Sequence, residues 1–233
     1  MRGLLGHLGS ARGGKRIGPR DSRMQVGFPG FAIDGPRAFL RAFLSGLFGL
    51  LIVFVATAAP SLAHIKSLAL VVTFDGSGTA FHLGRGCWIT ANHVVERVRA
   101  TRLFLHTGQS IAAVVVERNA PRDVALLRGD GPVPALRLSH EMPKAGEVLW
   151  ALGFPGDARQ YGQVIPVEGR VHPNTGTDGL VWISGTAFHG HSGSPVIGRD
   201  GTVVGMLVAV HRFWLDISLA VPSTVIRELV RRC

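Results

Sequence analysis

Cysteine and tyrosine are almost absent from the sequence, which holds two cysteines and one tyrosine in 233 residues. Two cysteines cannot build a disulfide-rich miniprotein, and they cannot supply the four ligands of a zinc finger. Charged residues make up only 17% of the chain and hydrophobic residues 46%, so the chain as a whole is not a disordered polar polymer. The 31 glycines follow no G-X-Y period, which excludes a collagen helix.

Acidic residues are also scarce, with 15 Asp and Glu against 25 Lys and Arg, for a formal charge of +10. Such an excess is typical of nucleic-acid binders when it is clustered on a folded domain. Residues 1–63, however, hold eight basic and two acidic side chains, so they carry +6 of the total. Residues 64–233 retain only +4 and have no basic-aromatic cluster. We therefore expect no nucleic-acid partner.

One long hydrophobic run is present. Arg41 is followed by an uncharged stretch, residues 42–63, that ends at His64. A basic flank, an apolar stretch and small residues such as Ser61 and Ala63 before a cleavage site are typical of a signal peptide. About 20 apolar residues can also span a bilayer, so an uncleaved anchor is the first alternative and a buried core helix the second. With either a signal peptide or an anchor we expect an exported protein, periplasmic or secreted, that contacts a membrane only if this segment is retained.

From His64 onwards the sequence consists of short β-branched runs separated by Gly, Pro, Asn and Asp. This pattern predicts an all-β protein of two lobes, barrels or sandwiches, with about six strands each. The expected strands are Ser67–Phe74, Thr79–Leu83, Cys87–Ala91, Arg102–His106, Ser110–Glu117, Val124–Arg128, Val148–Gly153, Gln163–Val171, Leu180–Ser184, Ser194–Gly198, Thr202–Val210 and Ile217–Val221.

The predicted domain organisation places lobe one at about 64–131 and a Pro-containing linker at 132–146. Lobe two follows at about 147–222. A C-terminal helix is expected over 223–232, with Ser223 as its N-cap and an apolar face. A second, short helix is expected after His93, over Val94–Val98.

Three segments carry residues suited to nucleophilic catalysis. An apolar strand ends in small residues and then presents His93, a second strand begins with Asp123, and a tight turn holds Ser192 between glycines. The segments are Cys87–Val95, Asp123–Leu127 and Gly190–Pro195.

Serine is a weak nucleophile until a base removes its proton, and histidine is the base suited to neutral pH. We therefore expect Ser192 as nucleophile and His93 as the general base and then acid. Asp123 would hold the ring of His93 in the correct tautomer. Gly190 lacks a Cβ, so its amide can turn inwards beside that of Ser192 to form an oxyanion hole.

Together these segments resemble the trypsin-like serine endopeptidases, particularly the exported bacterial ones of the HtrA/Deg and glutamyl-endopeptidase kind. The order His, Asp, Ser matches the family, and the resemblance extends from Ser67 to Arg232. The matching motifs are Gly76-Ser77-Gly78, Thr90-Ala91-Asn92-His93, Asp123-Val124-Ala125-Leu126-Leu127 and Gly190-His191-Ser192-Gly193-Ser194-Pro195.

The resemblance implies two six-stranded antiparallel β-barrels with the triad in the cleft between them. It also implies hydrolysis of protein or peptide substrates through an acyl-enzyme, without a cofactor. A catalytically inactive protease-fold domain that binds extended peptides is the alternative. The sequence makes no prediction of the oligomeric state.

The residues expected to line the substrate pocket depart from the specialised members of the family. The glutamyl-specific group has Thr or Ser five residues before the nucleophile and a His on the following strand, where this chain has Ala187 and Leu207. Thr186 stands where a Lys- or Arg-specific protease has aspartate. We therefore expect a small or medium apolar P1 residue, with His189 lining the cleft.

Two other interpretations of these residues have less support. The Gly190–Ser194 segment is similar to the nucleophile elbow of α/β-hydrolases, but too few residues follow it to hold an Asp and then a His. His189 and His191 lack a third ligand nearby in sequence, so no metal is expected. Cys87 and Cys233 either form a disulfide or remain as a buried thiol and a free terminal cysteine.

Overall fold

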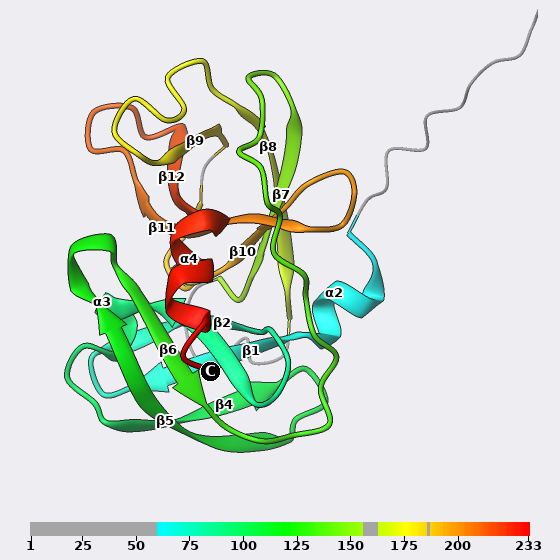
Figure 1. Cartoon of the computed structure of the whole chain (residues 1–233), viewed down its shortest axis with the longest axis vertical. Coiled ribbons are helices and arrows are strands. Elements are labelled where there is room, and N and C mark those ends of the chain that lie inside the picture. The colour runs from blue at the N-terminus through cyan, green and yellow to red at the C-terminus, as the bar shows by residue number, and fades with distance from the viewer. Residues whose placement is uncertain (1–59, 156–162, 186) are drawn as a thin grey trace, which may run out of the picture. The chain divides into compact units, whose positions relative to one another are not determined.

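The described part of the chain folds into two closed antiparallel barrels of six strands each (Figure 1). The structure is a computed structural model that describes residues 60–155, 163–185 and 187–233. Both barrels and the C-terminal helix agree with the expected trypsin-like fold. The predicted export segment, residues 42–63, lies outside the described residues except for its last four positions. Within the described ranges, no helix has the length and hydropathy needed to cross a membrane.

The first barrel is a sheet of strand order β1-β2-β3-β6-β5-β4, closed by the pairing of β1 with β4. Its inner face is apolar, and Phe81, Trp88 and Leu103 have no exposed surface. The strands are β1 (Leu68–Thr73), β2 (Gly76–His82), β3 (Cys87–Ala91), β4 (Ala100–Leu105), β5 (Ser110–Asn119) and β6 (Val124–Arg128).

The second barrel has the strand order β10-β11-β12-β9-β8-β7, closed by the pairing of β10 with β7. One apolar cluster lies within this barrel, while a larger one continues from the first barrel to residues such as Trp150, Met206 and Ile226. A shared core fixes the two barrels against each other. The strands are β7 (Val148–Gly153), β8 (Ile165–Val171), β9 (Val181–Ser184), β10 (Pro195–Ile197), β11 (Val203–Val210) and β12 (Ile217–Pro222).

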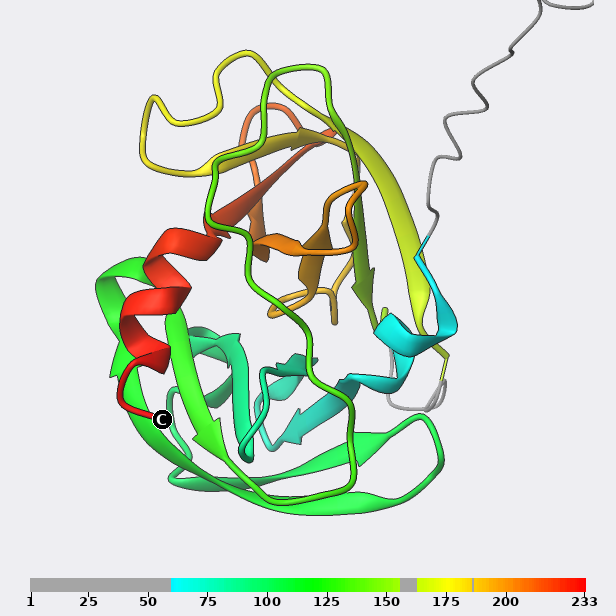
Figure 2. The ribbon, with the colours of Figure 1, turned by 45° about the vertical axis from the view of Figure 1, so that its right-hand side comes forward.

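The segment between β6 and β7 runs along the outside of both barrels (Figure 2). It forms a parallel bridge between Leu138 and Val203 on the second barrel. The described helical elements are α2 (Leu62–Lys66), α3 (Asn92–Val95), the 3-10 turn η1 (Ala120–Arg122) and α4 (Ser223–Val230).

Two helix predictions were wrong in detail. Helix α3 begins at Asn92, so His93 lies inside it rather than before it. Pro222 is the N-cap of α4, and Ser223 is already helical. The Ser223 hydroxyl instead donates a hydrogen bond to the carbonyl of Ser139, 2.9 Å away in the linker. A tertiary partner therefore replaced the local capping role that the sequence predicted for Ser223.

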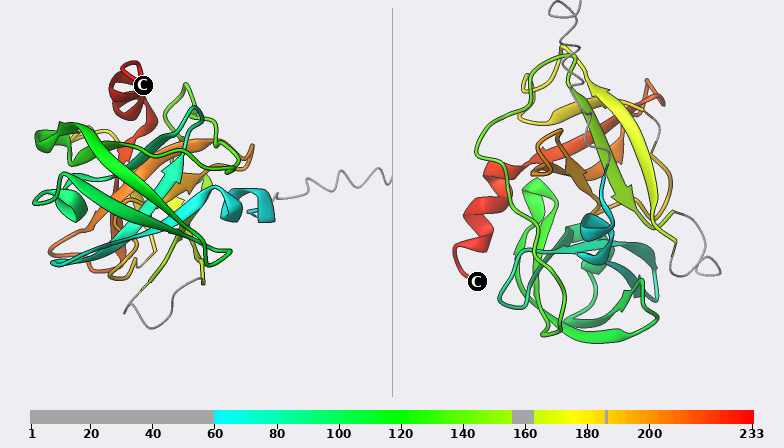
Figure 3. Two further views of the ribbon diagram at one scale, coloured as in Figure 1. Left: turned by 90° about the horizontal axis from the view of Figure 1, so that it is seen from below. Right: turned by 90° about the vertical axis from the view of Figure 1, so that its right-hand side faces the viewer.

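Helix α4 lies on the outer surface of the two barrels (Figure 3). Cys233, beyond its C-terminal end, forms a disulfide with Cys87 at the start of β3. The bridge joins residues 146 positions apart and resolves the two alternatives left open by the sequence. Arg128 donates a 2.8 Å hydrogen bond to the Cys233 carbonyl, and Arg232 pairs with Glu117. The C-terminus is thereby fixed to the barrel that carries His93.

Replacing Cys233 by serine is expected to lower the free energy of unfolding by about 2–5 kcal/mol. The bridge closes a long loop, so its loss increases the conformational freedom of the unfolded chain more than that of the native one. Urea unfolding followed by tryptophan fluorescence measures the change. Wild-type protein in reductant is the control, and it should unfold at the same urea concentration as the variant. Equal unfolding midpoints for variant and oxidised wild type would contradict the prediction.

Candidate active site

A close pair of side chains, His93 and Asp123, lies where β3 passes into α3 and η1 passes into β6. The Nδ1 atom of His93 is 2.7 Å from Oδ2 of Asp123. The backbone amide of His93 donates to the other carboxylate oxygen at 2.9 Å, and the amide of Asn92 donates to the Asp123 carbonyl at 3.1 Å. A carboxylate only accepts hydrogen bonds, so Nδ1 carries the proton and Nε2 is left as a base.

The backbone of Asp123 explains how its carboxylate reaches this position. Asn119 accepts a hydrogen bond from the amide of Arg122 and so caps the 3-10 turn η1. Asp123 ends that turn with a φ of +53°, in the left-handed region. Asparagine and aspartate adopt this region more readily than most residues. The turn therefore directs the side chain of Asp123 back across the end of β3 towards His93.

The pKa of the His93 imidazole is raised above its ordinary value of 6.5. The hydrogen bond with Asp123 is the main cause, and the negative charges of Asp123 and Glu96 add to it. Partial burial acts in the opposite direction. The side chain of His93 remains 46% exposed.

Ser192 lies on the tight loop that leads into β10. Two successive turns shape this loop, with the amide of His191 donating to the Phe188 carbonyl at 3.0 Å and the amide of Ser194 donating to the His191 carbonyl at 2.9 Å. Gly190 has a φ of +92°, which a residue with a Cβ adopts only under strain. Among the hydrogen bonds of the described residues, none occupies the amide of Gly190 or of Ser192. These two donors are available to a ligand.

Thr79 on β2 holds this loop against the first barrel, whereas the sequence predicts it only as the start of a strand. Its amide donates to the Ser192 carbonyl at 2.8 Å, and its hydroxyl donates to the Gly190 carbonyl at 2.9 Å. Thr79 is fully buried. Nothing in the local sequence predicts these bonds, because their partners lie more than 100 residues away in the chain.

Two glycines allow the close approach. A Cβ on Gly193 would collide with the Thr79 carbonyl oxygen, and a Cβ on Gly78 would lie within 3 Å of the Ser192 carbonyl oxygen and the Val94 side chain. The glycines in the two matched motifs are therefore required by contacts between the barrels as well as by local turns.

His93, Ser192, Gly190 and His189 line one pocket of about 310 Å³. The structure therefore brings together the predicted base, nucleophile, oxyanion donor and cleft histidine. Within the described residues, no hydrogen bond joins His93 to the Ser192 hydroxyl. Catalytic hydrogen bonds are often long in unliganded enzymes and tighten when substrate binds.

Two of the residues predicted to line the substrate pocket are buried. Ala187 and Leu207 are buried in the apolar cluster of the second barrel, at 6% and 3% exposure. Leu207 also accepts a hydrogen bond from the amide of Gly193 and donates one to the carbonyl of Ser194. Thr186 lies outside the described residues.

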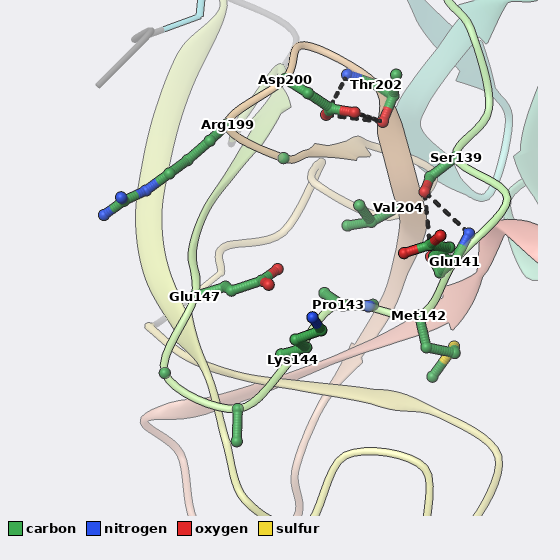
Figure 4. A pocket seen from close by; sticks show the side chains of 13 residues that line it. Ser139, Glu141, Met142, Pro143, Lys144, Glu147, Arg199, Asp200, Thr202 and Val204 are labelled. Carbon is green, nitrogen blue, oxygen red and sulfur yellow. Dashed lines mark hydrogen bonds between the residues drawn. The ribbon is translucent and has the colours of Figure 1, made fainter. Parts of the chain in front are cut away.

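A larger pocket, of about 700 Å³, lies between the linker and the turn after β10 (Figure 4). In this pocket the Thr202 hydroxyl donates a hydrogen bond to the Asp200 carboxylate, and the Ser139 hydroxyl donates one to the backbone carbonyl of Glu141. Its charged side chains are of both signs, and it contains no histidine or cysteine to act as a base or nucleophile. In the described part of the chain, no group of three His, Cys, Asp or Glu side chains is arranged to hold a metal. The predicted base His93 and the predicted nucleophile Ser192 lie in the smaller pocket and not in this one.

Comparison with known proteins agrees with this geometry. A family model described as trypsin-like peptidase domain matches residues 76–206. The chain is 28% identical to human serine protease HTRA4 over 192 residues, covering 76% of this chain and 40% of that protein. It is 24% identical to the periplasmic serine endoprotease DegP of Salmonella typhimurium over 164 residues, covering 66% of this chain and 34% of that protein. The chain thus spans about 40% of the length of these relatives or less.

Solved structures share the fold. The serine endoprotease of Yersinia pestis superposes with a TM-score of 0.64 at 17% identity, over 75% of this chain and 67% of that one. The inactive form of the Rv3671c protease of M. tuberculosis gives a TM-score of 0.62 at 21% identity, over 75% of this chain and 97% of that one. The motifs, the double barrel and the family match together show that the chain belongs to the family of trypsin-like peptidase domains, with curated relatives among the HtrA serine proteases.

Proposed function

We propose that the chain is a serine endopeptidase that cleaves protein or peptide substrates through an acyl-enzyme. The observation that carries the proposal is the pairing of His93 with Asp123 in the pocket that also holds Ser192 and the two free amides. A base of fixed tautomer, a hydroxyl and two backbone donors are the groups that acyl transfer needs.

The proposed reaction begins with attack of the Ser192 hydroxyl on the scissile carbonyl while Nε2 of His93 takes its proton. The amides of Gly190 and Ser192 stabilise the negative oxygen that forms. His93 then gives the proton to the leaving amine, and water hydrolyses the acyl-enzyme by the same route. Asp123 stays ionised throughout and stabilises the imidazolium.

An exported site of action is part of the proposal. The basic flank and apolar run of residues 41–63 favour translocation, and two of the relatives carry the word periplasmic in their names. The disulfide between Cys87 and Cys233 is also typical of an oxidising compartment. Whether the segment is cleaved or kept as an anchor would be decided by sequencing the N-terminus of the exported protein.

Labelling with a fluorophosphonate tests the proposed function. The reagent reacts with an activated serine, so we expect one adduct at Ser192 in folded protein and none in the Ser192→Ala variant. Mass spectrometry of the digested adduct identifies the residue, and casein or a quenched peptide reports cleavage. A folded protein that gives neither adduct nor cleavage would instead be a peptide-binding domain of the protease fold.

We further propose that the P1 pocket accepts a small or medium apolar side chain. Ala187 and Leu207 belong to a buried apolar cluster of the second barrel, so neither side chain can pair with the charge of Lys, Arg or Glu. Cleavage of a peptide library followed by mass spectrometry should show an enrichment of Ala, Val or Leu at P1 of about tenfold or more over charged residues. A dominant preference for Lys, Arg or Glu at P1 would refute the proposal.

A further inference from the structure

His191 is not among the residues that line the pocket of His93 and Ser192, although its neighbours Gly190 and Ser192 supply the proposed oxyanion donors. It has no exposed surface. The ring lies beside Gly153 of β7, where a Cβ would collide with it and with the Ser194 hydroxyl. A histidine is therefore enclosed beneath the nucleophile loop, and the catalytic steps described above do not use it.

Each ring nitrogen of His191 has a backbone hydrogen-bond partner. The amide of Phe188 donates to Nδ1 at 3.1 Å, and Nε2 lies 3.3 Å from the carbonyl oxygen of Ile165 on β8. An amide can only donate and a carbonyl can only accept, so Nδ1 is bare and Nε2 carries the proton. The two bonds specify one uncharged tautomer. A second proton, on Nδ1, would face the N–H of Phe188 and break that bond.

The bond to Phe188 closes the same turn that the backbone closes. The amide of His191 already donates to the Phe188 carbonyl, so residues 188 and 191 are joined by one backbone and one side-chain hydrogen bond. Gly190, with its left-handed φ, lies inside this turn. The orientation of the Gly190 amide therefore depends on the turn that the ring of His191 completes.

The surroundings of the ring favour the uncharged form. Burial lowers the pKa of His191, and the hydrogen bond to Ile165 offsets this only in part. Within residues 60–155, 163–185 and 187–233, no charged side chain contributes to the shift, including His189 on the same loop and Glu168 and Arg170 on β8. The other groups that crowd Gly153 beside the ring are the hydroxyls of Ser194 and Thr79, which are uncharged.

We propose that His191 is a positioning residue of the oxyanion loop. Its neutral ring, bonded to the Phe188 amide and the Ile165 carbonyl, holds the Gly190 and Ser192 amides towards the cleft, and protonation of the ring opens the loop. The inference rests on the proposed function, because the amides matter for catalysis only if Ser192 forms a tetrahedral intermediate.

Kinetics of two variants test the positioning role. His191→Leu keeps most of the volume but has no acceptor, whereas His191→Asn places its Oδ1 where Nδ1 stands and can still accept from Phe188. We expect the leucine variant to lower kcat by about 10- to 100-fold, with KM changed by less than about threefold. The asparagine variant should keep kcat within about fivefold of wild type. A leucine variant that retains the wild-type kcat would overturn the inference.

Unfolding at two pH values tests the protonation of the ring without relying on activity. Urea unfolding is measured near pH 7.5 and near pH 5, in the Ser192→Ala background with and without His191→Asn. The pKa of His191 is lower in the folded protein than in the unfolded chain. Acidification therefore favours the unfolded chain and should lower the free energy of unfolding. His191→Asn removes this part of the loss. His93 titrates in both proteins, so its contribution cancels. Equal losses of stability in the two proteins would overturn the inference.

The outcomes separate this inference from the proposed function. A wild-type protein that neither reacts with fluorophosphonate nor cleaves peptides refutes the function, while the unfolding comparison still decides how the ring behaves. An active wild type with an equally active His191→Leu variant refutes the inference and leaves the function intact. If the leucine variant does not fold, the kcat of the asparagine variant and the unfolding comparison at two pH values test the inference.

Discussion

Replacing Ser192 by alanine is expected to lower kcat by about 10⁶-fold. The hydroxyl supplies the nucleophile. Ser77 and Thr73 are the other hydroxyl residues that line this pocket in the described part of the chain, and neither belongs to the loop that carries Gly190. The variant should fold as the wild type does, because Ser192 makes its structural bond through its carbonyl.

Ser194→Ala is the matched control for this variant. Ser194 is also a buried loop serine, and its hydroxyl has no hydrogen-bond partner within the described residues. Its removal should change kcat by less than about threefold. Active-site titration and the cleavage rate of a quenched peptide measure both variants under the same conditions. A Ser192→Ala protein with more than about 1% of wild-type activity would contradict the assignment of the nucleophile.

The same variant separates a protease from a peptide-binding domain. If the chain is an enzyme, Ser192→Ala should bind uncleaved substrate peptides with an affinity close to the wild-type KM. If the chain is a binding domain, wild type and variant should bind alike and neither should release products. Fluorescence anisotropy with a labelled peptide, followed by chromatography of the same sample, distinguishes these outcomes.

The positions of most strands could be predicted from the sequence because short apolar runs ended at Gly, Asp or Pro. The predicted bounds of β3, β6 and β7 agree with the structure residue for residue. β8 was predicted to begin two residues too early and β2 three residues too late. Strand ends depend on the register of the partner strand, and that register is not a local property of the sequence.

The candidate triad could be predicted because each member lies within a short motif whose local turn directs its side chain. The supporting contacts could not. Thr79 reaches Gly190 across 111 positions, and Cys87 reaches Cys233 across 146. The sequence does not show on which side of the loop the ring of His191 lies, so the hydrogen bonds of that ring could not be predicted. Long-range closure of the barrels decides these contacts.

Replacing Asp123 by asparagine is expected to lower kcat by about 10⁴-fold at neutral pH while leaving the fold intact. Asparagine tolerates the left-handed backbone that Asp123 adopts, and its Oδ1 can still accept from the amide of His93. Its NH₂ group, however, would donate to Nδ1 of His93. The ring must then carry its proton on Nε2, so the nitrogen that faces Ser192 is no longer a base.

The pH dependence of the two proteins should differ in a defined direction. Catalysis needs neutral His93, so kcat/KM of the wild type should rise with pH through a midpoint above 6.5, because Asp123 raises the pKa of the ring. Without the carboxylate that midpoint should move to lower pH. The raised pKa also means that the His93–Asp123 pair stabilises the folded protein below about pH 6.5, and that this contribution is lost as pH rises through the folded pKa.

Kinetic profiles between about pH 5 and pH 9, and titration of the His93 ring protons by NMR in the Ser192→Ala background, measure these shifts. Asp130→Asn is the charge-matched control, because it removes an exposed carboxylate that makes no contact with His93. This control should change kcat by less than about threefold, and it should leave the midpoint of the pH profile unchanged. An Asp123→Asn protein with wild-type kcat and an unchanged midpoint would show that Asp123 does not orient His93. Another group would then have to orient the ring of His93.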